Sequence, residues 1–380
     1  MIENLIKDGI KALPPYMMGG DTIESVKERY NLDTVYRLSA NENQIGVSPM
    51  AVEAIINAVS KGNCYPGSGD LVKEKLAKKY TIENTRNFSS DNFIITIGAS
   101  GQLNLVGEMF ICKGDEVIFS ELSYPQYKLI TMKNEGIPIE IPINKETMEI
   151  DLDGMYNAIS DKTKLIWICN PNNPTGTILN HDKLVEFINK VPENIMVIVD
   201  EAYFEFINEP GYESMAKYAV TKPNVIVLRT FSKIYGLAGI RIGYSIAHNK
   251  TAHLMMKISG NYGTSSLAYA AACAAMDDYE FFNKTRNSVI EGRNYLITEL
   301  KRLGFKVWNS QTNFVYTDTG MDAFALAEKL KEYGIIIRGN FPVSRISVGT
   351  MEQNEAVISA IKDIVEKGEL AGKESFYAVG

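Results

Sequence analysis

IMVIVDEAY, residues 195–203, is the stretch that decides how the sequence around it is interpreted. Five apolar residues run directly into Asp200 and Glu201, which is typical of a short buried strand that ends in polar side chains. A carboxylate at such a depth is costly unless it has a partner. A cap or an internal salt bridge would meet that need for Asp200, and so would a protonated ring nitrogen of a bound cofactor.

Further short apolar runs alternate with helical patterns on both sides of this strand. The expected strands are FIITI (93–97), EVIFS (116–120), LIWIC (165–169), IMVIVD (195–200), NVIVL (224–228) and RIGYSIA (241–247). The expected helices are 48–60, 69–79, 101–112, 124–134 and 181–190. This alternation predicts an α/β fold with a large domain, whose mostly parallel sheet is covered by helices on both faces.

The pattern changes after about residue 275, where a long helix is expected at 278–303. The runs FKVW, TNFVY, IIIR and RISVG follow, with helices near 321–333 and 351–366, which is typical of a smaller α+β C-terminal domain. The expected division is an N-terminal arm, a large cofactor-binding domain and a small domain, at 1–45, 46–275 and 276–380.

The composition narrows the class of protein. Of the 380 residues 45% are hydrophobic and 22% charged, as in ordinary globular proteins, and the net charge is −7. No basic block suggests nucleic-acid binding, and no apolar stretch is long enough for a membrane span. The N-terminus has no continuous apolar segment typical of a signal peptide, so we expect a cytoplasmic protein.

The four cysteines are widely spaced and form no CxxC pair. Three of them lie within apolar runs, so we expect buried free thiols in a reducing compartment and no metal site.

Polar residues gather where the expected strands end. Gly98–Gly101 (GASG) follows FIITI and opens a helix, where backbone N–H groups can bind an anion, although small turns of this kind are common. Asn170–Gly176 (NPNNPTG) follows LIWIC. It is either a rigid turn only, or a fixed loop that presents an Asn amide to a cofactor oxygen.

Lys233 ends the third such cluster, Arg229–Lys233 (RTFSK), directly after a buried strand. A lysine desolvated in this way, or placed near positive charge, becomes a Schiff-base nucleophile. Ser232 and Arg241 supply the hydroxyl and the guanidinium donors that suit a phosphate. Arg338 and Arg345 lie at the ends of two short strands, and each needs an anion: an internal carboxylate, or a substrate carboxylate or phosphate.

Taken together and in this order, NPNNPTG, DEAY (Asp200–Tyr203) and SKIYGLAGIR (Ser232–Arg241) resemble the fold-type I pyridoxal-phosphate aminotransferases. Asn41–Asn43, Tyr65-Pro66 and Arg345–Thr350 (RISVGT) are similar to the histidinol-phosphate aminotransferase group. That group commonly has proline where this chain has Gln44. The resemblance spans roughly residues 14–366.

The resemblance implies a role for each matching residue. Lys233 would bind pyridoxal phosphate as a Schiff base and move a proton between Cα and C4′, while Asp200 would pair with the pyridinium nitrogen. Asn173 and Tyr203 would hold the ring O3′, with Tyr124 stacked on the ring. The residues implied to cradle the phosphate are Ala99, Ser100, Ser232 and Arg241, joined by Tyr65 of a second subunit in a homodimer with shared active sites.

The substrate residues follow from the same resemblance. Arg345 would bind the α-carboxylate of the amino donor, with Arg338, Tyr16 and Asn43 near the side chain or phosphate of the other substrate. The implied reaction is a ping-pong transamination between L-histidinol phosphate and 2-oxoglutarate. Alternatives on the same scaffold are a phospho-amino-acid decarboxylase, an amino-acid oxidase, and an aminotransferase for an aromatic or another phosphate-ester substrate. A non-enzymatic binding protein is disfavoured, because the implied catalytic set is intact.

Overall fold

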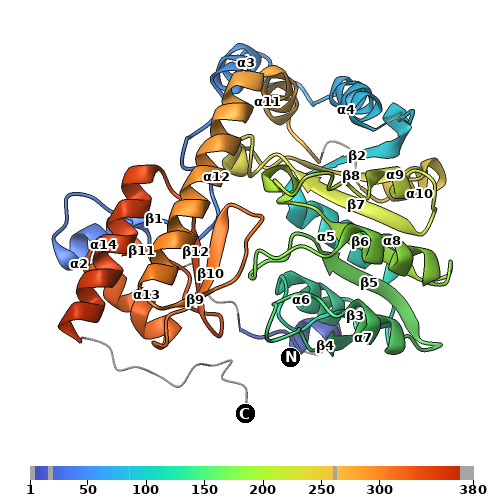
Figure 1. Ribbon diagram of the computed structural model, residues 1–380. Coiled ribbons are helices and arrows are strands. Elements are labelled where there is room, and N and C mark those ends of the chain that lie inside the picture. The colour runs from blue at the N-terminus through green and yellow to red at the C-terminus, as the bar shows by residue number, and fades with distance from the viewer. Residues whose placement is uncertain (1–4, 16–19, 85, 260–262, 369–380) are drawn as a thin grey trace.

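The computed structural model describes residues 5–15, 20–84, 86–259 and 263–368. Its larger part is built on a seven-stranded sheet with the strand order β2-β8-β7-β6-β5-β3-β4 (Figure 1). Within the described residues, β8 alone runs antiparallel to its neighbours. The strands are β2 (Phe93–Thr96), β3 (Glu116–Ser120), β4 (Ile137–Ile141), β5 (Thr163–Cys169), β6 (Met196–Asp200), β7 (Val225–Thr230) and β8 (Gly243–Ala247).

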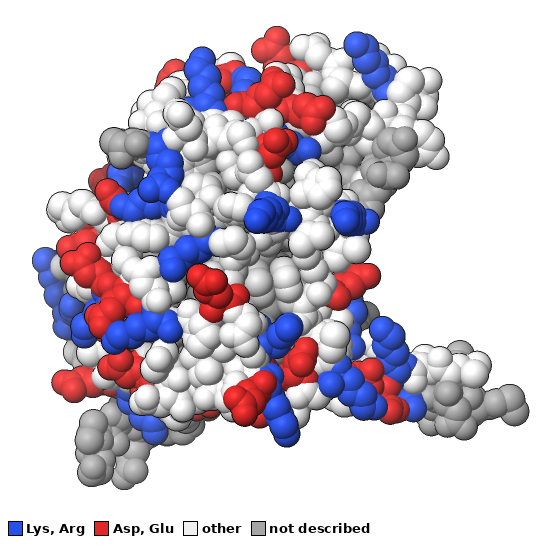
Figure 2. Space-filling model, turned by 90° about the vertical axis from the view of Figure 1, so that its right-hand side faces the viewer, with Lys and Arg blue, Asp and Glu red and all other residues white. Residues whose placement is uncertain are grey.

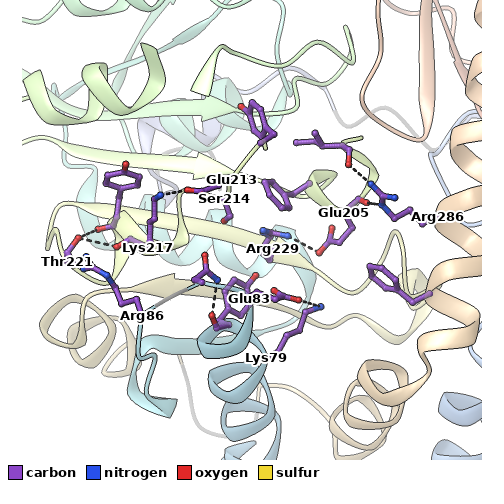
Figure 3. Close-up of a pocket in the computed structure, with 17 residues that line it drawn as sticks. Lys79, Glu83, Arg86, Glu205, Glu213, Ser214, Lys217, Thr221, Arg229 and Arg286 are labelled. Atoms are coloured by element: carbon purple, nitrogen blue, oxygen red, sulfur yellow. Dashed lines mark hydrogen bonds and ion pairs between the residues drawn. The ribbon is translucent and has the colours of Figure 1, made fainter. Parts of the chain in front are cut away.

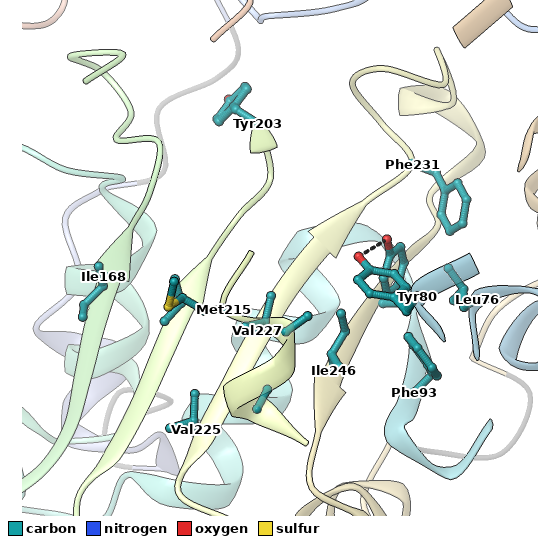
Figure 4. Packing of buried hydrophobic residues seen from close by; sticks show 14 of the residues in the cluster. Leu76, Tyr80, Phe93, Ile168, Tyr203, Met215, Val225, Val227, Phe231 and Ile246 are labelled. Atoms are coloured by element: carbon teal, nitrogen blue, oxygen red, sulfur yellow. Dashed lines mark hydrogen bonds between the residues drawn. The ribbon is translucent and has the colours of Figure 1, made fainter. Parts of the chain in front are cut away.

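Helices cover both faces of this sheet, because successive strand residues point to opposite sides. Val197 and Val199 of β6 pack in one apolar cluster, part of which Figure 4 shows, and Ile198 packs in the other. The helices of the first face include α3 (Pro49–Val59), α4 (Asp70–Glu83), α7 (Leu152–Asn157), α8 (His181–Lys190), α9 (Ala216–Ala219) and α11 (Ser266–Asp277). Those of the second face are α5 (Gly98–Phe110), α6 (Gln126–Lys133) and α10 (Asn249–Met256). The predicted α/β fold is confirmed.

A smaller unit follows, with its own apolar cluster. Its elements are α12 (Tyr279–Arg302), β9 (Lys306–Val307), β10 (Phe314–Asp318), α13 (Ala323–Glu332), β11 (Ile335–Ile336), β12 (Ser344–Ser347) and α14 (Met351–Lys367). β12, β10 and β9 form an antiparallel sheet.

The N-terminal arm contains α1 (Asp8–Lys11), α2 (Ile23–Tyr30) and β1 (Tyr36–Arg37). α2 and β1 pack on this smaller unit, against α13 and β11, whereas α1 packs on α6 of the large unit. β1 pairs with β11, and Leu38 is buried in the smaller unit's cluster. The expected domain boundaries stay a prediction.

Three local predictions were wrong. The edge strand β4 was not predicted because it contains Pro138, which is tolerated at a sheet edge. Three of the four cysteines were expected to be buried, but only Cys169 and Cys273 are. Cys112 follows α5 and is exposed, as is Cys64. Arg338 was placed at the end of a strand, yet β11 stops at Ile336 and Arg338 instead forms an isolated antiparallel bridge with Arg345.

Basic and acidic side chains are interspersed over the face that Figure 2 shows, without a broad block of one sign. Among the described helices, none is both long enough and apolar enough to cross a membrane.

Candidate active site

The carboxyl ends of β5, β6 and β7 meet at one edge of the sheet. Parallel pairing places Cys169 beside Asp200, and Asp200 beside Leu228, so the three following loops converge. A cavity of about 480 Å³ lies there. The predicted residues that line it are Ala99, Ser100, Tyr124, Asn173, Asp200, Tyr203, Ser232, Lys233, Arg241, Arg338 and Arg345. The structure thus gathers eleven of the fourteen predicted site residues around one cavity.

Asp200 is 4% exposed and has neutral hydrogen-bond partners. Its Oδ2 accepts from the Tyr127 hydroxyl at 2.8 Å and its Oδ1 from the Ala202 N–H at 3.1 Å. Burial raises the pKa of Asp200, and the hydrogen bond from Tyr127 opposes that rise. A buried carboxylate without a cation in ion-pair contact fits a ligand that brings a protonated nitrogen.

Lys233 lies between the arm and the large unit. Its Nζ donates to the carbonyl oxygens of Ala40 at 3.3 Å and Asn41 at 3.1 Å. Desolvation and the positive charge of Arg345 together lower the pKa of Lys233 to about 8. About a tenth of the amine is therefore neutral, and nucleophilic, at pH 7.

A phosphate-sized cradle opens at the start of α5. Gly98 has a φ of +66°, and an added Cβ would lie 2.8 Å from Nη2 of Arg241, so glycine lets the guanidinium approach the helix N-terminus. Ser232 adds a buried hydroxyl. Backbone N–H groups, a hydroxyl and a guanidinium together fit a phosphate dianion. Among the described residues, no group of three or more His, Cys, Asp and Glu could hold a metal ion.

Two arginines share the opposite wall. Arg345 is 5% exposed, and its Nη1 and Nη2 donate to Asn173 Oδ1 at 2.8 Å and the Ser39 carbonyl at 2.5 Å. Its Nε has no acceptor among the described residues. Burial lowers the pKa of Arg345 to about 10, and neighbouring Arg338 also lowers it. The Tyr203 hydroxyl accepts from Asn41 Nδ2 at 3.1 Å, which ties the arm to the same wall.

Three predicted residues do not line the cavity. Tyr65 is 83% exposed elsewhere on the surface, and Asn43 donates to the Ile234 carbonyl at 3.1 Å. Tyr16 lies outside the described residues. The roles assigned to all three stay predictions.

Comparison with known proteins agrees with this geometry. The profile of the family "Aminotransferase class I and II" matches residues 33–361. The chain belongs to this family. A histidinol-phosphate aminotransferase 2 of Carboxydothermus hydrogenoformans is 35% identical over 369 residues, covering 95% of this chain and 99% of the relative. A histidinol-phosphate aminotransferase of Anoxybacillus flavithermus is 34% identical over 98% of this chain and the whole relative.

Solved structures agree as well. Histidinol-phosphate aminotransferase from Sinorhizobium meliloti, in complex with pyridoxal 5′-phosphate, superposes with a TM-score of 0.85 at 28% identity, over 95% of this chain and 98% of that one. Aspartate aminotransferase from Thermus thermophilus has the same fold, with a TM-score of 0.80 at 22% identity over 94% of this chain and 99% of that one. This aminotransferase therefore has the type I fold and uses pyridoxal phosphate.

Two residues at the site of this aminotransferase had no role assigned to them from the sequence. Tyr127 is fully buried behind Asp200, with its ring stacked on Trp167 at 5.0 Å. Its only signal was its position three residues after Tyr124, which places both tyrosines on one side of the helix. Asn41 is buried with a φ of +54°, and it bonds both Tyr203 and Ser347. Asn41 Oδ1 accepts a hydrogen bond from Ser347, which lies 306 positions further along the chain. No local sequence pattern contains such a contact.

The first prediction concerns the pH dependence of cofactor capture by the cofactor-free enzyme, followed by absorbance in stopped flow. The neutral amine reacts, and the pKa of Lys233 lies near 8 rather than 10.5, so the rate should rise with pH through about 8. Arg345→Gln removes a charge that lowers this pKa, so it should move the midpoint upward. Arg302→Gln, on the exposed face of α12, is the control. A midpoint near 10 in the unaltered enzyme would contradict this account.

The second prediction concerns Tyr127→Phe. Loss of the hydroxyl leaves Asp200 with one fewer donor, so the pKa of Asp200 should rise further and the carboxylate should bind the ring nitrogen less well. Hydrogen bonds to charged groups contribute about 1.5–3 kcal/mol, so the Kd for pyridoxal phosphate should rise about tenfold or more. Equilibrium titration followed by fluorescence measures it. An unchanged Kd, equal to that of the half-exposed control Tyr156→Phe, would disprove the role.

Proposed function

We propose that this enzyme exchanges an amino group between L-histidinol phosphate and 2-oxoglutarate in a ping-pong reaction. The observation that carries the proposal is the pair of guanidinium groups, Arg338 and Arg345, on one wall of the cofactor cavity. Neither forms an ion pair with a carboxylate of the described residues. The relatives named histidinol-phosphate aminotransferase support the substrate.

Arginine suits both anions that the two substrates bring. A guanidinium binds a carboxylate or a phosphate through two parallel hydrogen bonds. The α-carboxylate of glutamate corresponds in position to the phosphate ester of histidinol phosphate. The side-chain carboxylate of glutamate corresponds to the imidazole of histidinol phosphate. Arg345, with an unsatisfied Nε, and its bridge partner Arg338 can therefore receive each anion in turn.

The chain's own residues divide the work of the reaction. Bound pyridoxal phosphate supplies an aldehyde that accepts the amino group and a ring that withdraws electrons. Asp200 would hold its charge against the ring nitrogen, and Tyr124 would lie against the ring face. Lys233 would move the proton at the substrate Cα, since its lowered pKa suits a general base near neutral pH.

The third prediction tests this substrate assignment. L-Glutamate alone should change the absorbance of the cofactor-loaded enzyme, and double-reciprocal plots with histidinol phosphate and 2-oxoglutarate should be parallel. Arg345→Gln should lower kcat/KM by about 30-fold or more, since losing one partner of a buried charged contact costs about 2–5 kcal/mol. Arg302→Gln should leave it unchanged. Release of CO2 or peroxide would instead identify a decarboxylase or an oxidase.

We also propose a homodimer in which Tyr65 of each subunit reaches the partner's phosphate cradle. Tyr65 is 83% exposed and is not among the described residues that line the cofactor cavity of its own subunit. Nearby, α3 exposes Met50, Val52, Ile56 and Val59, by 43–66%. An apolar helix face of this kind marks an interaction surface, and a second copy of the chain would cover it in a symmetric dimer.

The fourth prediction tests the shared sites by mixing two inactive variants, Tyr65→Ala and Lys233→Ala. Random exchange makes half of the dimers mixed, and each mixed dimer has one site with both native residues. Activity should therefore recover to about a quarter of the native value. Recovery should depend on subunit exchange, so mixing without partial denaturation serves as the control. No recovery, with the mixed dimer demonstrated by native mass spectrometry, would contradict shared sites.

A further inference from the structure

A second cavity, of about 690 Å³, is shown in Figure 3. It opens between α4, α9, α12 and the short 3-10 helix η3 (Phe204–Phe206), and we call it the Arg229 cavity. It shares no lining residue with the cofactor cavity among the described residues. Glu201 and Phe204, next to Asp200 and Tyr203 in sequence, nevertheless belong to its surroundings. The two cavities are therefore neighbours with separate walls.

Buried ion pairs of Arg229 lie at one wall of the Arg229 cavity. Arg229 is 4% exposed, and its Nε and Nη1 donate to Glu201 at 2.8 Å and Glu205 at 2.9 Å. Its guanidinium carbon lies 4.1 Å from the centre of the Phe204 ring. Both carboxylates are thus engaged with Arg229, and the three side chains together carry one net negative charge.

The described lining residues include five basic and three acidic side chains. Lys217 pairs with Glu213, and Lys79 lies 3.8 Å from Glu83. Two arginines remain without a carboxylate within ion-pair distance among the described residues: Arg86 and Arg286.

These two arginines differ in their contacts. Arg286 donates through Nε and Nη2 to the carbonyl oxygens of Glu205 at 2.9 Å and Ile207 at 2.7 Å, which fixes its guanidinium in place. Arg86 is exposed. Figure 3 shows Arg86 toward the α9 side and Arg286 at the α12 side, with Arg229 between them. The two guanidinium groups that have no carboxylate in direct contact among the described residues therefore lie at different ends of the cavity.

We propose that the Arg229 cavity is a second binding site, for an elongated organic dicarboxylate whose two ends pair with Arg86 and Arg286. Guanidinium groups bind carboxylates through paired hydrogen bonds, and a ligand with a carboxylate at each end satisfies both. Tyr80, Phe204 and Phe282 also line the cavity and suit an apolar chain. A compact dianion such as sulfate carries no second anionic group, at a distance from the first, for the other arginine.

The experiment must separate this site from the active site, which also binds carboxylates. The enzyme is therefore the cofactor-loaded Arg345→Gln variant, and the ligands are unbranched dicarboxylates from succinate to suberate, with sulfate for comparison. Isothermal titration calorimetry should show one site per chain, with an affinity that peaks at one chain length and exceeds that for sulfate. Sulfate binding as tightly as the best dicarboxylate would overturn the proposal.

The decisive variant is Arg86→Gln in the same Arg345→Gln background. Because Arg86 is exposed and has no hydrogen bond or ion pair in the described part of the chain, its replacement leaves the fold intact. It should weaken binding of the best dicarboxylate about fivefold or more. Arg302→Gln, an exposed arginine outside the cavity, should have no effect. Equal affinity in the Arg86→Gln and Arg302→Gln proteins, or no binding to either, would overturn the proposal.

Discussion

Asp200 places a carboxyl group at the end of β6, where it is 4% exposed and its hydrogen-bond partners among the described residues are neutral. A negative charge on this carboxyl group is unfavourable by an amount on the order of several kcal/mol unless a cation completes the site. The Tyr127 hydroxyl and the Ala202 N–H donate to this carboxyl group. A protonated nitrogen of the cofactor would supply the missing cation, and the other residues that line the cavity would hold the rest of the cofactor.

The sheet explains how this arrangement is kept in position. Parallel pairing of β5, β6 and β7 brings three loop starts to one edge, and apolar clusters on both faces hold the strands in register. On the opposite wall the arm joins the smaller unit, where Asn41 connects Tyr203 of the large unit to Ser347 of the small one. The cavity is thus closed by both units, and a change in either affects Lys233 through the carbonyls of Ala40 and Asn41.

The sequence predicted those features of the fold and the site that depend on neighbouring residues along the chain. The apolar runs predicted six of the seven strands of the large sheet. Asp200 and Lys233 were predicted as site residues because they lie at the end of such runs or soon after, whereas the role of Asn173 came from the resemblance, and all three line the cavity. β4 was missed because Pro138 hides an edge strand, and Arg338 was misplaced because its bridge to Arg345 is a tertiary contact. Tyr127 and Asn41 act on residues 73 and 162 positions away, so only the folded chain shows them.

In the cofactor-loaded enzyme one pyridoxal phosphate would be bonded to the amine of Lys233 while its ring nitrogen faces Asp200. Borohydride reduction of the enzyme loaded with pyridoxal phosphate, followed by peptide mass mapping, tests this most directly. We expect a single phosphopyridoxyl adduct, on the peptide that contains Lys233, and we expect this adduct to be absent in the Lys233→Ala variant. An adduct on another lysine, or a colourless protein without any adduct, would contradict it.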